Sequence, residues 1–470
     1  IMNILLAATV LAGISSMVSM CLAFNVLFTG GAMVWEFGFN PVFGKVSFCV
    51  DSLSAFFLLV ISIMGFLAVL YSNGYLKPYA EKGKKIGGHV IFLLLLIFSM
   101  ELVVTCSNAI LFLIFWEIMS VSSFFLVIFE NDKKDVLKAG IKYLVFMHVS
   151  VLFIIASFVL SQCHGNASIV FLLAFIGFGT KAGFVPFHNW LPEAHPAAPS
   201  HVSAIMSGVM IKTGIYGILR VILSAGVPDK WLCYLVLIVS AISGLYGVLY
   251  AIVQHDLKRL LAYHSIENIG IIGIGIGIGM LGLSYGSRIV AFLGFAGGIL
   301  HVLNHSIFKE LLFLAAGNVY LKTHTRDIES LGGLVKKMPV TAAMFLIASV
   351  AICGLPPFNG FISEFLIYFG MIKGLGFDSF YVLILIMFVL AALALIGTMA
   401  ILCFTKAFSV VFLGTPRSGH AQIEKSSSGK TIILPMCVLA LFIFLIGMFP
   451  QYAVLIVSSP VLMFTGEVEL

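Results

Sequence analysis

The chain has 470 residues, of which 61% are hydrophobic and only 10% are charged. This composition excludes an ordinary soluble domain and indicates a membrane protein. The net charge of +6 comes from lysine-rich loops and does not indicate a nucleic-acid partner. The polar connections are too short to form a separate domain. The sequence therefore predicts an all-α, polytopic protein embedded in a lipid bilayer.

Thirteen apolar stretches are predicted to cross the membrane as helices, because about 20 apolar residues span a bilayer. In chain order they are residues 2–29, 52–72, 89–107, 109–129, 142–162, 167–187, 202–223, 231–254, 262–282, 289–318, 340–374, 381–412 and 432–459. The first stretch is too long for the core of a signal peptide and is interpreted as a retained helix.

The lysines and arginines between the spans favour one side of the membrane by 17 to 5. Basic loops tend to remain in the cytoplasm. The side that includes Lys82, Lys133 and Lys425 is therefore predicted to be cytoplasmic. The two sides alternate from span to span, so Ile1 is expected in the cytoplasm and Leu470 outside.

Two proline motifs predict an internal repeat. The motif GFVPF at 183–187 is matched 171 residues later by GLPPF at 354–358. Proline breaks a helix, and broken helices in corresponding places of two halves point to a transport site. A first repeat of five spans is predicted for about residues 89–223 and a second for about 231–412. Because five is odd, the two repeats are expected to be inverted.

Nine ionisable residues lie within or near the predicted spans. An ionised side chain at the bilayer centre costs roughly 2.5–3.5 kcal/mol even on the lenient insertion scale. These groups are therefore expected to face the bundle interior, to pair with one another or to contact water. They are Lys181, Lys212, Lys309, Lys406, Glu101, Glu117, Glu267, Glu310 and Glu364.

The tenth span carries the strongest local pattern. His301, His305 and Lys309 are spaced by four residues and fall within an arc of about 80° on one helix face. A single histidine would more often be a satisfied core residue, whereas three aligned titratable groups indicate a proton path. Glu310 is expected beside the row, paired with a lysine, and Glu364 follows the second break.

The first half contributes three further candidates. Glu117 lies in the middle of its span, and Lys181 lies five residues before Pro186. A lysine beside a broken helix is desolvated and can gain and lose a proton. Lys212 is about ten residues from either end of its span, too deep to reach the surface, and Tyr216 is a possible hydrogen-bond partner for it.

The remaining histidines divide into two groups. His148 stands alone in the fifth span, and a structural role is favoured for it, as it is for His188 and His195 near the first break. The accessory candidates for proton transfer are His201, His264, Glu267 and Glu310.

No cofactor and no metal are expected. The eight cysteines form no CxxC pair, and most are interpreted as small buried hydrophobic residues. The run GIIGIGIGIG at 270–279 follows no strand, so it is not a dinucleotide fingerprint. It is interpreted as a small-residue face for close helix packing.

Five longer motifs occur together: FWE, GFVPFHNWLPEAHPAAPS, DLKRLLAYHSIENIG, HVLNHSIFKELLFLAAG and GLPPFNGFISEF. They resemble the antiporter-like proton-channel subunits of respiratory complex I and its relatives, and most of all the large membrane subunits of formate hydrogenlyase and membrane-bound hydrogenases. The resemblance implies a core of about 14 helices with two inverted five-helix repeats. It also implies a Glu117–Lys181 pair, central lysines at Lys212 and Lys309, and a terminal role for Glu364.

The sequence thus predicts a proton-translocating subunit in the cell membrane of a prokaryote. It would work with other membrane and peripheral subunits of a redox complex. Protons would enter near Lys181 or His201, pass Lys212 and the tenth span, and leave near Glu364. The alternatives are a subunit of a sodium/proton antiporter and a stand-alone transporter of an organic solute. A purely structural scaffold is disfavoured by the cost of the buried charges.

Overall fold

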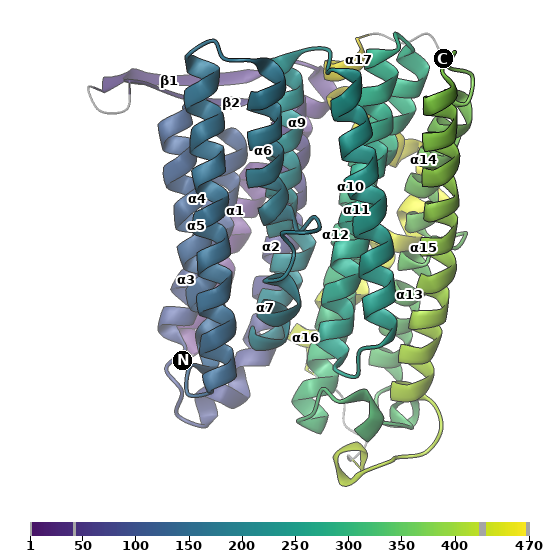
Figure 1. Cartoon of the computed structure of the whole chain (residues 1–470). Helices are drawn as coiled ribbons and strands as arrows, with labels where there is room; N and C mark the ends of the chain where they lie inside the picture. Colours follow the sequence, from purple (N-terminus) through teal and green to yellow (C-terminus); the bar gives the residue numbers. More distant parts are fainter. Residues whose placement is uncertain (1, 41–43, 423–428, 467–470) are drawn as a thin grey trace.

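The computed structural model describes residues 2–40, 44–422 and 429–466. Ile1, Lys425 and Leu470 lie outside these residues, so the membrane sides predicted for them stay predictions. The described chain is a bundle of long helices that run roughly parallel to one axis (Figure 1). This arrangement satisfies each backbone polar group within its own helix, as a bilayer requires.

A β-hairpin interrupts the helices near the start of the chain. Its antiparallel strands turn near Gly44, which has a positive φ of 71°. The sequence analysis did not predict this element. The elements of this part are α1 (Met2–Thr29), β1 (Met33–Asn40), β2 (Gly44–Val50), α2 (Ser52–Glu81), α3 (Gly87–Thr105), α4 (Ala109–Val127), the 3₁₀ turn η1 (Ile128–Glu130) and α5 (Lys134–Gln162).

The middle of the chain contains the first break and a π-helical turn. Its elements are α6 (Ala167–Ala182), α7 (Leu191–Ala197), α8 (Ser200–Ile205), the π turn η2 (Met206–Met210), α9 (Ile211–Ala225), α10 (Lys230–Ile252), α11 (Leu257–Ser284) and α12 (Arg288–Thr323).

The last part contains the second break. Its elements are the 3₁₀ turns η3 (Ile328–Ser330) and η4 (Leu334–Lys336), α13 (Pro339–Ile352), α14 (Asn359–Gly374), α15 (Phe380–Phe412), the 3₁₀ turn η5 (Gly419–Ala421), α16 (Lys430–Met448) and α17 (Pro450–Thr465).

The helices match the predicted spans. Within the described residues, 11 helices are long and apolar enough to cross a membrane. The predicted span 167–187 corresponds to α6, and α7 lies in the connection after it. The predicted spans 340–374 and 432–459 are instead each built from two helices, α13 with α14 and α16 with α17. Every predicted span therefore has a counterpart, and both predicted breaks are confirmed. The limits of the two five-helix repeats stay a prediction.

Glycine makes both breaks possible. Gly183 ends α6 with a φ of 95°, and Gly354 follows α13 with a φ of 64°. An L-residue with a side chain rarely adopts this left-handed conformation, which ends a helix. Pro186 and Pro357 follow three residues later and prevent the helix from continuing. The two breaks therefore have the same local cause.

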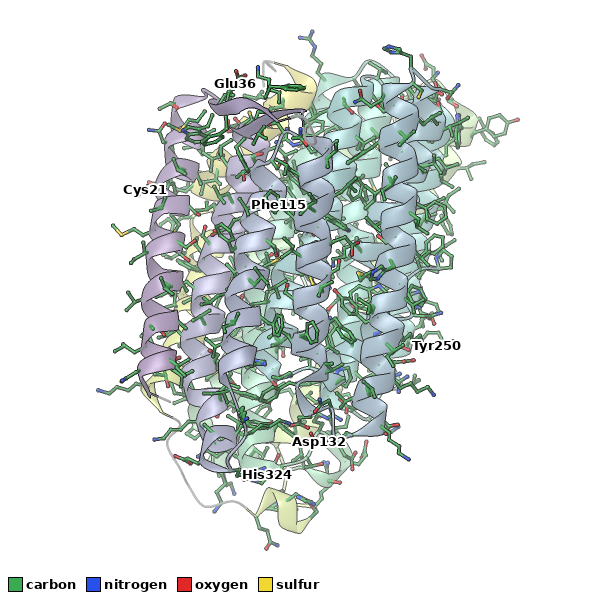
Figure 2. All side chains as sticks on the ribbon, turned by 90° about the vertical axis from the view of Figure 1, so that its left-hand side faces the viewer. Cys21, Glu36, Phe115, Asp132, Tyr250 and His324 are labelled. Carbon is green, nitrogen blue, oxygen red and sulfur yellow. The ribbon has the colours of Figure 1, made fainter. Side chains whose placement is uncertain are left out.

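The loops lie at two opposite ends of the bundle. The end with β1 and β2 is called the hairpin end, and the other the lysine-rich end. Figure 2 places Glu36 at the hairpin end and Asp132 and His324 at the opposite one. Ion pairs link the loops there: Lys84 Nζ lies 3.6 Å from Asp132 Oδ1, and Arg326 Nε lies 3.2 Å from Asp256 Oδ2.

The glycine-rich run packs α11 closely against its neighbours, as predicted. A Cβ atom on Gly275 would lie 2.7 Å from the Gly298 Cα of α12. A Cβ atom on Gly270 would lie 2.4 Å from the Gly244 nitrogen of α10. Only glycine permits such an approach. The contact brings the polar side chains of α11 and α12 together in the centre of the bundle.

Candidate functional site

The predicted row on α12 is completely buried. His301, His305, Lys309 and Glu310 have no solvent exposure. His301 joins three helices, because its Nδ1 lies 2.9 Å from Ser363 Oγ on α14 and its Nε2 lies 3.0 Å from an oxygen of α11. That oxygen is Oδ1 of Asn268. The His301 and His305 rings stack with 6.5 Å between their centroids.

Most polar atoms farther along this row have no protein partner. Both ring nitrogens of His305, Lys309 Nζ and both oxygens of Glu310 lack a hydrogen bond to any described residue. Buried polar atoms are nearly always bonded to protein or to ordered water. The middle of α12 is therefore suited to hold water molecules in contact with groups that can carry a proton.

The π turn explains how Lys212 is accommodated. Lys212 is buried, and its Nζ donates a hydrogen bond to the Ser207 carbonyl oxygen of that turn. The carboxylate of Glu310 packs against the same π turn, because a Cβ atom on Gly208 would be 3.5 Å from Glu310 Oε2. Tyr216 does not bond to Lys212 as expected; its hydroxyl donates to the Val104 carbonyl at 2.8 Å.

A short polar bridge connects Lys212 to α11. Ser207 Oγ on the π turn lies 2.7 Å from Ser265 Oγ on α11. One residue before Ser265, His264 Nδ1 bonds to Glu267 Oε2. Both side chains are buried, and each keeps one polar atom that no described residue satisfies. These accessory candidates therefore lie in the same buried region as Lys309.

Lys181 ends α6 at the first break and is buried against α4 and α5. Its Nζ lies 3.2 Å from Tyr143 Oη and 3.3 Å from Ser120 Oγ. Tyr143 in turn lies 2.6 Å from Ser123 Oγ. The Trp116 ring centroid is 5.7 Å from Lys181 Nζ, close enough for a cation–π contact.

The implied Glu117–Lys181 pair forms no direct ion pair or hydrogen bond in the described structure, and its electrostatic role stays a prediction. Trp116 and Ser120 are one turn apart on the face of α4 that meets Lys181, whereas Glu117 is about 100° from Trp116 and about 60° from Ser120 around the helix. Its Oε2 lies 3.7 Å from His148 Nε2 on α5. His148, for which a structural role is predicted, lies against this carboxylate on the surface of the bundle, and that role stays a prediction. The contact between Glu117 and His148 depends on how α4 and α5 face each other, which a single sequence does not reveal.

Glu364 lies at the second break. It occupies the second turn of α14 and is buried. A Cβ atom on Gly354 would lie 2.6 Å from Glu364 Oε2. The carboxylate therefore covers the left-handed glycine that ends α13. This places Glu364 at the far side of the α12 row, where His301 bonds Ser363 of the same helix.

Two histidines form a contact near the lysine-rich end. His201 Nε2 lies 2.8 Å from His89 Nε2, and both rings are buried. His89 was not predicted, although it begins a span directly after a lysine-rich loop. A cavity of about 380 Å³ reaches this region and is lined by Tyr75 and Lys258. The Tyr75 ring meets His201 edge to face, with 5.2 Å between centroids.

His195 on α7, for which a structural role is predicted, lies beside the α12 row. It has no solvent exposure, and neither ring nitrogen has a partner among the described residues. Its ring stacks on Phe313 of α12 at 5.0 Å. Lys309 Nζ lies 5.9 Å from that same ring. His195 therefore connects the first break to the α12 row.

Two charged residues within the spans lie away from this region and are satisfied locally. Glu101 accepts hydrogen bonds from Ser15 and Ser19 of α1, at 2.9 and 3.1 Å. Lys406 Nζ donates to the Ile252 carbonyl at 2.9 Å. In the described part of the chain, no three His, Cys, Asp or Glu side chains are placed to hold a metal ion.

A family model described as "NADH:quinone oxidoreductase/Mrp antiporter, TM" matches residues 106–394. The chain belongs to this family. A second model, described as the N-terminus of chain 5 of complex I NADH-ubiquinone oxidoreductase, matches residues 42–84. The matched region of this chain, residues 106–394, includes both breaks, the π turn and the α12 row. The family resemblance seen in the motifs is thus confirmed.

Curated relatives cover most of this chain. Hydrogenase-4 component B of Escherichia coli K12 is 41% identical over 90% of the chain. Formate hydrogenlyase subunit 3 of the same organism is 34% identical over 84%. The Na(+)/H(+) antiporter subunit A1 of Staphylococcus haemolyticus is 30% identical over 90%. The chain spans 65%, 65% and 55% of these three proteins, respectively.

Two solved structures share the fold. A chain of the Mrp complex from Dietzia sp. DQ12-45-1b superposes with a TM-score of 0.84 at 20% identity, covering 99% of this chain and 93% of that one. A chain of the membrane-bound sulfane sulfur reductase, an archaeal respiratory membrane complex, gives 0.80 at 21% identity, covering 97% and 91%. The chain is an integral membrane protein of this architecture.

Proposed function

We propose that this chain is the proton-translocating membrane subunit of a redox-driven complex of the hydrogenase-4 or formate hydrogenlyase type. The observation that carries the proposal is the buried row from Lys212 to Glu364. It places lysine, glutamate and histidine side chains from α9, α11, α12 and α14 in one connected region. Such groups are costly inside a membrane protein and usually mark a proton path.

The proposed path begins at the lysine-rich end, which we assign to the cytoplasm from its excess of basic loops. A proton would enter through the 380 Å³ cavity and reach His201 or His195. It would then pass to the Lys212–Glu310 pair. From there it would move along α12, toward its N-terminus, through Lys309, His305 and His301. It would leave near Glu364 of α14.

Lys212 and Glu310 suit a proton-transfer step. When Lys212 is protonated and Glu310 ionised, the two charges stabilise each other in a medium of low dielectric constant. Transfer of one proton from the ammonium to the carboxylate leaves two neutral groups. Neither Glu310 oxygen is held by a hydrogen bond from a described residue. The carboxyl group can therefore rotate and pass the proton toward Lys309.

A neighbouring membrane subunit would cover the α4–α5 face. Glu117 and His148 lie in the middle of their helices, and their side chains are 32% and 54% exposed in this chain alone. An ionisable pair facing lipid is costly. On the side where α3, α4 and α5 are drawn, the hairpin projects past the bundle (Figure 1). Its Phe37 and Phe39 are exposed, which suits a protein contact.

The predicted inverted repeats are consistent with separate regions for proton intake and proton exit. Residues 89–223 would hold the Lys181 group and the intake from the lysine-rich end. Residues 231–412 would hold the α12 row and the exit at Glu364. The fourth member of each proposed repeat is the broken pair of helices, which supports the repeat limits.

The similarity to an antiporter subunit supports one alternative, sodium/proton exchange. The test is to purify the chain with its associated subunits and reconstitute them in vesicles. Redox turnover that acidifies or alkalises the vesicle lumen without sodium would support the proposal. Proton movement that requires a sodium gradient and no electron donor would support the antiporter. Transport of an organic solute by the chain alone would contradict both.

A further inference from the structure

A second cavity lies in the first half of the bundle, at the hairpin end. Its volume is about 430 Å³, and residues of α4, α5, α6 and α9 form most of its lining. We call it the hairpin cavity. Polar side chains line its upper wall, and two native thiols border it. The residues that matter here are Asp51, Tyr216, Arg220, Cys49 and Cys106.

The floor of this cavity is a layer of aromatic rings. Phe112 and Phe178 line the cavity, and Trp116 lies directly behind them. The Trp116 ring centroid is 5.6 Å from that of Phe112 and 5.3 Å from that of Phe178. Trp116 is fully buried, and its indole N–H has no acceptor among the described residues. A donor without an acceptor is rare in a folded core.

Lys181 lies on the other side of the aromatic layer. Along α6, Lys181 follows Phe178 by one turn, and along α4, Ser120 follows Trp116 by one turn. Lys181 Nζ is 3.3 Å from Ser120 Oγ and 5.7 Å from the Trp116 ring. One layer of side chains therefore separates a buried lysine from a cavity at the hairpin end.

The wall of the cavity does not repel a cation. Arg220 is neutralised by Asp51, with Nη1 and Nη2 each 2.5 Å from a carboxylate oxygen. Arg220 also bonds to Ser54 Oγ at 2.6 Å and to Tyr216 Oη at 2.9 Å. The network fixes the guanidinium against the wall. The centre of the cavity is left free of net charge from this pair.

We propose that the hairpin cavity is a water-filled vestibule through which Lys181 exchanges protons with the hairpin side. The proposal rests on the proposed function and adds a second outlet to it, separate from the exit at Glu364. When the aromatic layer opens, the Lys181 ammonium gives its proton to a water molecule of the vestibule. The products are a neutral amine and a hydronium ion. When the layer is closed, Lys181 contacts only the interior groups.

Phe178 is the movable part of the layer. Its ring packs on Gly217 of α9, where a Cβ atom would lie 2.4 Å from Phe178 Cδ1. Because Gly217 has no side chain, the Phe178 ring can occupy this position. Rotation of the ring away from Trp116 would join the cavity to the space around Lys181. Gly217→Ala would therefore force the ring out of its position.

Cysteine labelling tests the vestibule without measuring transport. Ala109, Phe112 and Ser120 lie on one face of α4 at increasing depth. Each is replaced by Cys, after Cys49→Ser, Cys106→Ser and Cys163→Ser, in the assembled complex in vesicles. A charged, impermeant methanethiosulfonate is added from the hairpin side. We expect labelling at 109 and 112, none at 120, and labelling at 120 once Phe178→Ala is added.

Two labelling results would overturn the proposal. The first is an unlabelled Phe112→Cys in a complex where Ala109→Cys is labelled. The second is equal labelling of Ser120→Cys with and without Phe178→Ala. If Phe178→Ala fails to assemble, Phe178→Leu removes the ring and keeps most of the volume. Since labelling needs no redox turnover, labelled variants in a complex that moves no protons would reject only the proposed function.

A proton-leak measurement adds a second readout. Without an electron donor, vesicles with Phe178→Ala should dissipate a pH gradient faster than wild type. Phe175→Ala is the matched control, because Phe175 lies one turn earlier on α6 and does not line the cavity. Adding Lys181→Ala should remove the extra leak. An extra leak that persists without Lys181, or equal leaks in the two phenylalanine variants, would overturn the proposal.

Discussion

Glu117 Oε2 lies 3.7 Å from His148 Nε2, on the outer faces of α4 and α5. The two side chains form an ion pair when the histidine is protonated. Lys181, the partner implied by the family resemblance, is held instead by Ser120 and Tyr143. The first half of the bundle thus contains an inner lysine and an outer acid–histidine pair. The pair would influence Lys181 through its field and through any subunit that covers it.

Glu117 and His148 are expected to act as a unit. Glu117→Gln and His148→Gln should each lower the number of protons moved per electron, and the double variant should lose little more, because either change breaks the pair. Val149→Ala, beside His148 and exposed on α5, is the control. Proton uptake and redox turnover are measured in the same vesicles. Fully additive losses would contradict the pairing.

Gly214 is expected to be required for the contact between α6 and α9. A Cβ atom there would lie 2.4 Å from the Phe178 carbonyl oxygen and 2.9 Å from the Ala182 nitrogen. Gly214→Ala should lower the stability by about 1–3 kcal/mol, as overpacking does. Gly208→Ala is the control, since its nearest contact would be 3.4 Å from the Ser306 oxygen. Thermal unfolding in detergent should separate the two variants; equal melting temperatures would contradict this packing.

Asp51 is expected to set part of the stability at low pH. Burial raises the pKa of its carboxyl group, but the Arg220 and Ser54 hydrogen bonds outweigh burial, so the pKa is lowered overall. A lowered folded-state pKa contributes stability above the unfolded value of about 3.9. That contribution is lost as the pH falls through the folded pKa.

Asp51→Asn should therefore cost on the order of 3 kcal/mol at neutral pH, because Arg220 keeps its charge without a partner. It should also flatten the loss of stability below about pH 4. The measurement is unfolding in detergent from pH 3 to pH 7. A parallel shift of the whole curve, with the same acid slope as wild type, would contradict the role of this carboxylate.

The two ends of the bundle are expected to face opposite compartments. Single cysteines at Lys84 and Lys133 should be labelled by an impermeant reagent from the cytoplasmic side only. A cysteine at Asp229, which bonds Ser168 at the hairpin end, should be labelled from the other side only. The measurement uses intact cells and inverted vesicles. Labelling of all three positions from one side would refute the alternation of the spans.

Sequence patterns were sufficient for features that depend on local chemistry. Hydrophobic length gave the spans, and glycine with proline gave both breaks. The four-residue spacing of His301, His305 and Lys309 gave the buried row. Features that depend on helix rotation were missed. The rotation of α4 about its axis, which directs Glu117 away from Lys181, is set by packing against other helices. The same is true of the His89–His201 contact.

Other features needed backbone geometry. The π turn before Lys212 supplies the Ser207 carbonyl that accepts its hydrogen bond, and no residue type in Met206–Met210 identifies such a turn. The sequence predicts a structural role for His195. Its stacking on Phe313, where Lys309 also lies, depends on the contact between the first break and α12.

The central claim is that protons move along the α12 row, and Lys309→Ala tests it most directly. Lys309 Nζ lies in the row without a protein hydrogen bond in the described structure, whereas Lys406, the matched control, is bonded to the Ile252 carbonyl outside it. The measurement is the number of protons moved per electron in vesicles containing the assembled complex. We predict a large loss for Lys309→Ala and a ratio near wild type for Lys406→Ala. An unchanged ratio in an assembled Lys309→Ala complex would contradict the account.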